Sequence, residues 1–88
     1  MIATRTNTRQ LKTWNKAVAS GKTVYRIESL EVATIDEDGF EHFEWANVSN
    51  SLAIDLGNDK FLYRDDYRLA VEWSHEFESD SVRLIKIS

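Results

Sequence analysis

The chain has 88 residues, with 42% hydrophobic and 11% aromatic content and no cysteine. A chain of this length buries one core, so we expect a single domain over residues 1–88. The lack of cysteine excludes a disulfide framework, a thiolate zinc site and a cysteine nucleophile. No apolar run begins the chain and no segment is long enough to span a bilayer, which predicts a cytoplasmic protein without a membrane partner.

The net charge of −4 combines two oppositely charged parts. Residues 1–27 contain six basic residues and no acidic one, giving +6, whereas residues 28–88 contain 15 acidic and five basic residues, giving −10. Such a charge asymmetry is informative about how the protein associates with partners, and it says nothing about the fold.

The first predicted element is an amphipathic helix from about residue 8 to Ser20. Asn7, followed by Gln10, is typical of a helix start, and Gly21 is typical of a helix end. Apolar residues recur at helical spacing on one face and basic residues on the opposite face. The apolar face has Leu11, Trp14, Ala17 and Val18, and the basic face has Arg9, Lys12 and Lys16.

Residues 23–35 and 40–48 are predicted to form a β-hairpin. The first strand is rich in β-branched residues, but its alternation changes phase near Glu28-Ser29, which predicts a bulge or break there. Asp38-Gly39 is a strong turn signal. In the returning strand, Phe43 and Trp45 share one face, and His42 and Glu44 share the other.

Residues 49–57 and 60–64 read as two further strands around a turn at 57–59. Residues 67–78 then alternate without a break, and we expect this twelve-residue strand to form the floor of the core. A last strand is predicted over residues 82–87. The row expected to be buried comprises Tyr67, Leu69, Val71, Trp73, His75 and Phe77.

One helix followed by five or six antiparallel strands predicts an α+β fold. We expect the helix to lie on one face of a curved antiparallel sheet, as in a cystatin-like roll. A small, partly open barrel with the helix as its plug is the alternative.

A helix that closes on Gly21-Lys22 and enters a strand through Val24 and Arg26 resembles the opening of many small phage proteins. Sponge proteins that sequester signalling nucleotides are among them. The resemblance covers about sixteen residues, and helix, glycine cap and strand would produce it in any α+β protein. It therefore implies no family membership, although it is consistent with a protein of phage or mobile-element origin.

Catalysis is not expected. His42 and His75 are the only side chains that titrate near neutral pH, and the chain lacks a Gly-rich phosphate loop, a nucleophile elbow and a His-Glu-x-x-His spacing. We interpret His75 as a core or sheet-edge residue and His42 as a surface residue. Glu41, Glu44 and Glu76 could join the histidines around a metal, but two-residue spacings are common in acidic strands, so we expect neither metal nor cofactor.

Acidic residues gather around the predicted hairpin and the 67–78 strand. They can be interpreted as a solvated sheet face that resists edge pairing, or as a surface that docks on a basic partner. These residues are Asp36, Glu37, Asp38, Glu41, Glu44, Asp65, Asp66, Glu72 and Glu76.

The basic helix also has two interpretations. Arg5, Arg9, Lys12 and Lys16 can be the water-facing side of an amphipathic helix, or an anion site at a helix start. Nucleic acid is not expected as a partner, because the bases are few and the rest of the chain is acidic.

The leading hypothesis is a non-catalytic inhibitor or modulator that binds a basic protein partner through the acidic face. The alternative is a binder of an anionic nucleotide or RNA at the basic helix. The two-part charge also predicts a homodimer that salt weakens, because screening reduces the attraction between exposed opposite charges.

Overall fold

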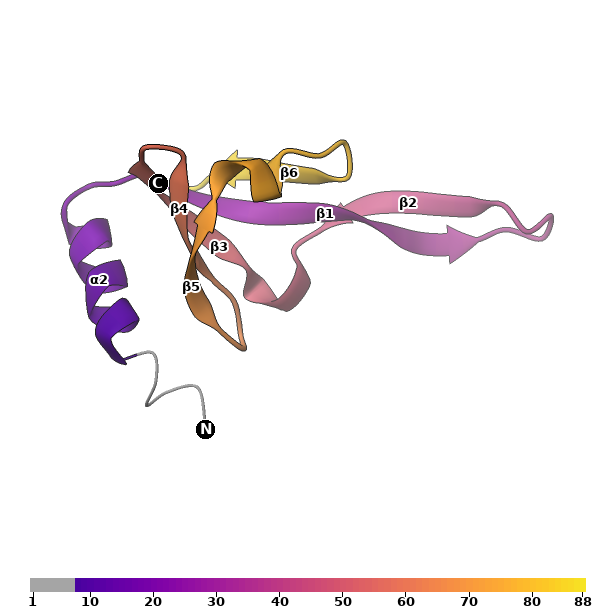
Figure 1. Cartoon of the computed structure of the whole chain (residues 1–88). Coiled ribbons are helices and arrows are strands. Elements are labelled where there is room, and N and C mark those ends of the chain that lie inside the picture. Colours follow the sequence, from indigo (N-terminus) through magenta and orange to yellow (C-terminus); the bar gives the residue numbers. More distant parts are fainter. Residues whose placement is uncertain (1–7) are drawn as a thin grey trace.

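Six antiparallel strands form one open sheet, and a helix packs on one of its faces (Figure 1). The computed structural model describes residues 8–88. The strand order is β2-β1-β3-β4-β5, with β6 paired to β1, and the sheet does not close. The α+β prediction is confirmed, and the barrel alternative is wrong. The elements are α2 (Thr8–Ala19), β1 (Val24–Ile35), β2 (Glu41–Ala46), β3 (Leu52–Gly57), β4 (Lys60–Arg64), β5 (Leu69–Trp73) and β6 (Val82–Lys86), with 3-10 helices at Val48–Asn50 and Ser74–Phe77.

The end of α2 follows the predicted glycine cap. Gly21 has a φ of 81°, a left-handed conformation that glycine adopts without strain. Its N–H donates to Val18 O at 3.0 Å, and the Lys22 N–H donates to Ala17 O at 3.2 Å. This pair of bonds is a Schellman motif, which satisfies the last helical carbonyls and turns the chain into β1.

The long strand β1 changes partners along its length. Its first residues pair with β3 through Val24–Arg26, and its last pair with β2 through Ser29–Ile35. β6 pairs with Tyr25–Ser29, a stretch that overlaps both of these. The bulge lies between Val32 and Thr34 instead of near Glu28-Ser29 as predicted, because the earlier phase change marks the exchange of partner strands.

The core lies between α2 and the middle of the sheet. Ile54 on β3 and Leu62 on β4 are its most buried large side chains, at 0% and 1% exposure. These two residues are directly paired, so β3 and β4 form the floor beneath the helix. The other buried members of the cluster are Trp14, Ala17, Val24 and Leu69.

The prediction of a twelve-residue core strand at 67–78 is wrong. β5 ends at Trp73 and is the outermost strand in the sheet order, with only β4 beside it. Of its predicted buried row, Leu69 is buried, whereas Val71 and Trp73 are 55% and 52% exposed. His75 is also exposed and lies on the 3-10 helix after this edge strand, so it is not a core residue. The helix covers this outer strand only near Leu69, so Val71 and Trp73 remain exposed to water.

The 3-10 helix after β5 packs against the face of the sheet opposite α2. Its Phe77 ring lies 5.3 Å from the Phe61 ring and 6.2 Å from the Tyr63 ring, between centroids. Tyr25 packs edge-on against Phe61 at 6.1 Å. Phe61 and Tyr63 flank the buried Leu62, so alternation along β4 places this aromatic cluster on the face away from α2.

The β1–β2 hairpin projects from the rest of the molecule as an arm, defined here as residues 30–46 (Figure 1). The molecule measures 50 × 30 × 20 Å along its principal axes. The helix α2 lies at one end of this long shape and the tip of the arm at the other.

Candidate interaction surface

The tip of the arm is built around the Asp36 carboxylate. Its Oδ1 accepts the N–H groups of Asp38 at 3.0 Å and Phe40 at 2.9 Å, and its Oδ2 lies 3.0 Å from His42 Nε2. The hydrogen bond with His42, followed by that from the Phe40 N–H, lowers the pKa of Asp36 below its ordinary value. Gly39, at a φ of 85°, completes the turn. Asp36 therefore organises the tip, whereas Glu37 and Asp38 are exposed.

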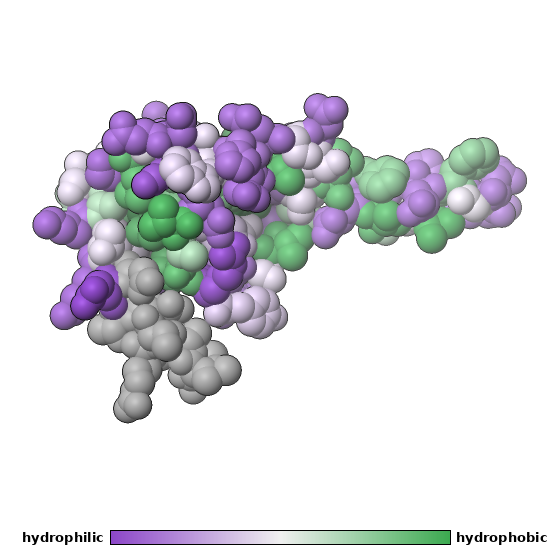
Figure 2. Space-filling model, viewed as in Figure 1, coloured by the Kyte–Doolittle hydropathy of each residue, from purple (hydrophilic) through white to green (hydrophobic). Residues whose placement is uncertain are grey.

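One face of the arm is apolar and uncovered within residues 8–88. Val32 pairs with Phe43, and Leu30 pairs with Trp45. The bulge after Val32 shifts the alternation by one residue, so Ile35 joins this face opposite Glu41. Val32, Ile35 and Phe43 are 46%, 64% and 56% exposed. Figure 2 shows apolar side chains interspersed with hydrophilic ones along the arm.

The other face of the arm is polar. Glu31 lies directly opposite Glu44, and Thr34 lies opposite His42. All four residues are exposed. Like charges directly opposite one another weaken a two-stranded ribbon, so the arm carries this pair at a cost to its own stability.

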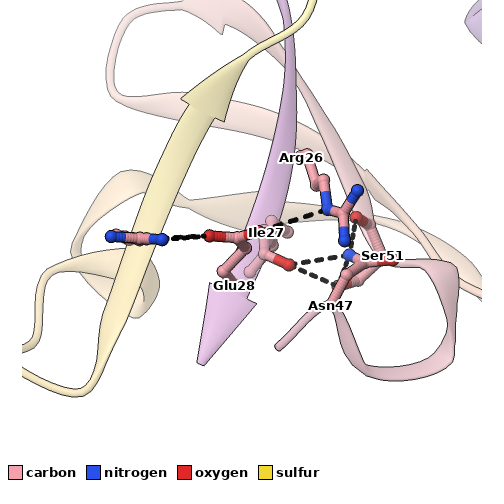
Figure 3. Close-up of polar contacts among 6 residues, drawn as sticks. Arg26, Ile27, Glu28, Asn47 and Ser51 are labelled. Carbon is pink, nitrogen blue, oxygen red and sulfur yellow. Dashed lines mark hydrogen bonds and ion pairs between the residues drawn. The ribbon is translucent and has the colours of Figure 1, made fainter. Parts of the chain in front are cut away.

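A charged cluster joins the arm to the body of the molecule (Figure 3). Glu28 on β1 accepts hydrogen bonds from Arg83 on β6, with Arg83 Nη2 2.7 Å and Nε 2.8 Å from Glu28 Oε1. Arg26 Nε lies 3.4 Å from the second carboxylate oxygen. The Arg83 guanidinium also lies 4.4 Å from the centre of the Trp45 ring, a cation–π distance. Arg83 thereby ties the base of the arm to β6.

A second junction lies where β1 passes from β3 to β2. Asn47 Nδ2 donates to Ile27 O at 2.7 Å and to Ser51 O at 2.9 Å. The Ile27 N–H donates to Ser51 O at 3.2 Å. These contacts, drawn in Figure 3, satisfy the backbone where the strand pairing is interrupted.

The structure divides the nine predicted acidic residues between two places. Five lie on the arm, namely Asp36, Glu37, Asp38, Glu41 and Glu44. The remaining four lie on the body, at or near β5 and its following 3-10 helix, namely Asp65, Asp66, Glu72 and Glu76.

The body acids are largely engaged within the chain. Asp65 accepts the Tyr63 hydroxyl at 2.6 Å and the N–H groups of Tyr67 and Arg68 at 2.8 Å each. Burial raises the pKa of Asp65, but these hydrogen bonds outweigh it and leave the pKa lowered. Asp66 accepts a hydrogen bond from the Asn50 amide, and Glu72 accepts one from the Arg68 guanidinium. Asp65, Asp66 and Glu72 therefore stabilise the β4–β5 connection and do not extend the acidic surface of the arm.

Glu76 lies elsewhere, on the 3-10 helix, with its carboxylate 3.5 Å from His75 Nε2 and its side chain 55% exposed. Within residues 8–88, no three His, Asp or Glu side chains gather in an arrangement that could hold a metal ion.

The predicted basic stripe lies on the exposed side of α2. Arg9, Lys12 and Lys16 are all exposed, whereas Arg5 lies outside the described residues. The buried side of the helix presents Trp14, and the Arg64 guanidinium lies 5.4 Å from the centre of its ring.

No helix within residues 8–88 has the length and apolarity to cross a membrane.

Comparison of the chain with protein-family models, curated proteins and solved structures finds no match.

The sequence identified the acids of the arm but missed its exposed apolar face. The alternation of Phe43 and Trp45 against His42 and Glu44 indicated a two-sided strand, which is what the structure has. A two-sided strand normally turns its apolar side to a core, and nothing local shows that this hairpin extends past the helix.

Proposed function

We propose that this protein is a non-catalytic binding protein that recognises a macromolecular partner with a basic surface through the arm, and that this binding inhibits or modulates the partner. The observation that carries the proposal is the uncovered apolar face of Val32, Ile35 and Phe43 on an acidic hairpin that projects from the body. An isolated two-stranded hairpin is marginally stable in water, so a partner that covers this face would stabilise it.

The charge of the arm supports a basic partner. Residues 30–46 contain six acidic residues and neither lysine nor arginine. Apolar contacts would supply affinity, and the surrounding carboxylates would select a positive surface and speed association with it. The opposed Glu31 and Glu44 fit this proposal, because a binding surface can retain charges that its own fold would be more stable without.

The remaining parts of the proposal follow from the composition and the surroundings of the histidines. His42 is bound to Asp36 at the tip, and His75 lies beside Glu76 on the surface, so neither is combined with a nucleophile in the described contacts. A chain without cysteine fits a protein that folds without disulfides, and on this ground we place it in the cytoplasm.

The test is affinity capture from lysate of the source organism with three immobilised forms. The first is the unmodified chain, and the second is the arm variant Glu37→Gln/Asp38→Asn/Glu41→Gln. The third is a matched control, Glu76→Gln/Glu78→Gln/Asp80→Asn, which neutralises three exposed carboxylates outside the arm. Bound proteins are eluted with salt and identified by mass spectrometry.

We expect one basic protein to bind the unmodified chain and the control, to elute with salt, and to be lost from the arm variant. Retention by the arm variant would contradict the proposal. Strong retention of the chain on heparin, lost with Lys12→Glu/Lys16→Glu, would instead favour an anionic ligand at α2.

A further inference from the structure

We infer that a second copy of this chain provides a basic surface that the arm fits, with the arm of each copy lying across the exposed, basic side of α2 of the other. The inference rests on the proposed role of the arm as a binding element. It names a reciprocal homodimer as an assembly in which both arms contact a basic helix.

The charges of the two surfaces are complementary. The arm has six acidic residues and no lysine or arginine. The helix α2 has Arg9, Lys12 and Lys16 and no acidic residue, and all three side chains are exposed. An acidic ribbon on a basic helix therefore brings opposite charges together, whereas an arm packed on another arm would bring carboxylates together.

The contact is electrostatic, because the exposed apolar residues of α2 lie on a different face from its bases. Leu11 and Val18 on α2 are 38% and 46% exposed, beside the buried Trp14. They belong to the apolar face of the helix, opposite Lys12 and Lys16, so an arm that meets the bases does not also cover them. The axis of α2 runs across the long axis of the molecule, along which the arm projects, so the arm of an antiparallel copy crosses α2 rather than following its length (Figure 1).

The shape of the molecule favours a reciprocal pair. The helix and the tip of the arm lie at opposite ends of the long axis (Figure 1). Two copies placed side by side in opposite directions would set each arm beside the other copy's helix, related by a two-fold axis. One arm crossing one helix, about 10 Å wide, is a small contact, so both contacts are needed and the dimer should be weak.

A charge swap tests this arrangement. The helix variant Lys12→Glu/Lys16→Glu and the arm variant Glu37→Lys/Glu41→Lys each change exposed residues, so both should fold. Sedimentation equilibrium is measured in 50 mM and 1 M salt for the unmodified chain, for each variant alone and for their equimolar mixture. Glu78→Lys/Asp80→Lys, outside both surfaces, is the matched control.

We expect the unmodified chain and the control to dimerise in 50 mM salt and to dissociate in 1 M salt, where the Debye length falls to about 3 Å. Each variant alone should bind itself at least about tenfold more weakly, because like charges then face each other. The mixture should recover a heterodimer, because both of its arm–helix contacts again pair opposite charges.

Two results would overturn the inference. The first is a monomer at high protein concentration in 50 mM salt, and the second is a dimer that the helix variant does not weaken. A monomer that still captures a basic protein through its arm would leave the proposed function standing. A charge-swappable dimer that captures no other protein would leave only the homodimer.

Discussion

At the scale of single residues, several acidic residues that look like part of a charged surface instead accept hydrogen bonds that hold the fold together. Asp65 is the clearest case, because its two oxygens accept the Tyr63 hydroxyl and two backbone N–H groups. Burial, followed by the hydrogen bond to Asp65, raises the pKa of Tyr63 to about 12. A free tyrosine titrates near pH 10, so the folded protein holds Tyr63 in its neutral form.

This shift predicts the alkaline behaviour of the protein. Because the folded pKa of Tyr63 lies above the unfolded value, its contribution to stability is complete below about pH 10 and is lost as the pH rises toward about 12. Tyr63→Phe keeps the ring beside Phe77 but removes the hydroxyl. We expect it to lower the free energy of unfolding at pH 7 by about 1–2 kcal/mol, as a partly exposed hydrogen bond to a charged group would.

The measurement is urea unfolding of both forms from pH 7 to pH 12. Loss of stability above pH 10 should be smaller in Tyr63→Phe than in the unmodified chain. Equal losses in the two forms would show that another group governs the alkaline limit.

At the scale of elements, β3 and β4 carry the core and β5 does not. Leu62 is 1% exposed beneath α2, whereas the Trp73 ring is 52% exposed with Lys60 Nζ 4.9 Å from its centre. Leu62→Ala should therefore cost about 2–5 kcal/mol in the free energy of unfolding, the range for a buried leucine. Trp73→Ala should cost only about 1 kcal/mol, because half of its surface already meets water.

Chemical denaturation of both variants at pH 7 and 25 °C compares these costs. A larger loss for Trp73→Ala than for Leu62→Ala would mean that the residue 67–78 row is the floor of the core after all. Circular dichroism before unfolding checks that each variant retains the sheet.

The same contrast shows what the sequence could and could not predict. Periodicity located α2, and turn residues such as Gly21 and Gly39 located the ends of elements, because these signals act over a few residues. The alternation over residues 67–78 was equally regular, yet the strand stops at Trp73. Position at the edge of the sheet and the return of Phe77 to the far face depend on tertiary contacts, which a local pattern does not contain.

The candidate surface was predictable to a similar extent. Composition placed Glu37, Asp38 and Glu41 on one hairpin, and the structure has them there. Its exposed apolar face was not predicted, because the alternation of Phe43 and Trp45 does not show whether a core covers that side. The division between arm and body acids also depends on hydrogen bonds such as that of Asp66 with Asn50, which join residues 16 apart.

At the scale of the whole molecule, a body with a packed core carries an arm that contributes little to it. The arm meets the body through Arg83 and Asn47, and the Asn47 amide bridges the Ile27 and Ser51 carbonyls. Stability is then expected to be uneven, with local opening of the arm well below the free energy of global unfolding.

Amide hydrogen exchange tests this division together with Asn47→Ala. In the unmodified chain at 1 M salt, amides of β3 and β4 should exchange most slowly and those of the arm much faster. Asn47→Ala removes one donor from each of the two carbonyls, at a cost of about 1–3 kcal/mol for the two hydrogen bonds. Exchange should therefore accelerate further at the base of the arm, around Ile27 and Leu30.

Asn50→Gly is the matched control, because Asn50 lies in the same connection, its side chain bonds the exposed Asp66, and glycine adopts its φ of 53° without strain. Its exchange pattern should remain that of the unmodified chain. Protection of the arm equal to that of β4, or equal effects of the two substitutions, would show that arm and body open as one unit. In that case Asn47 would not hold the arm to the body, and the arm would be as rigid as the core that carries it.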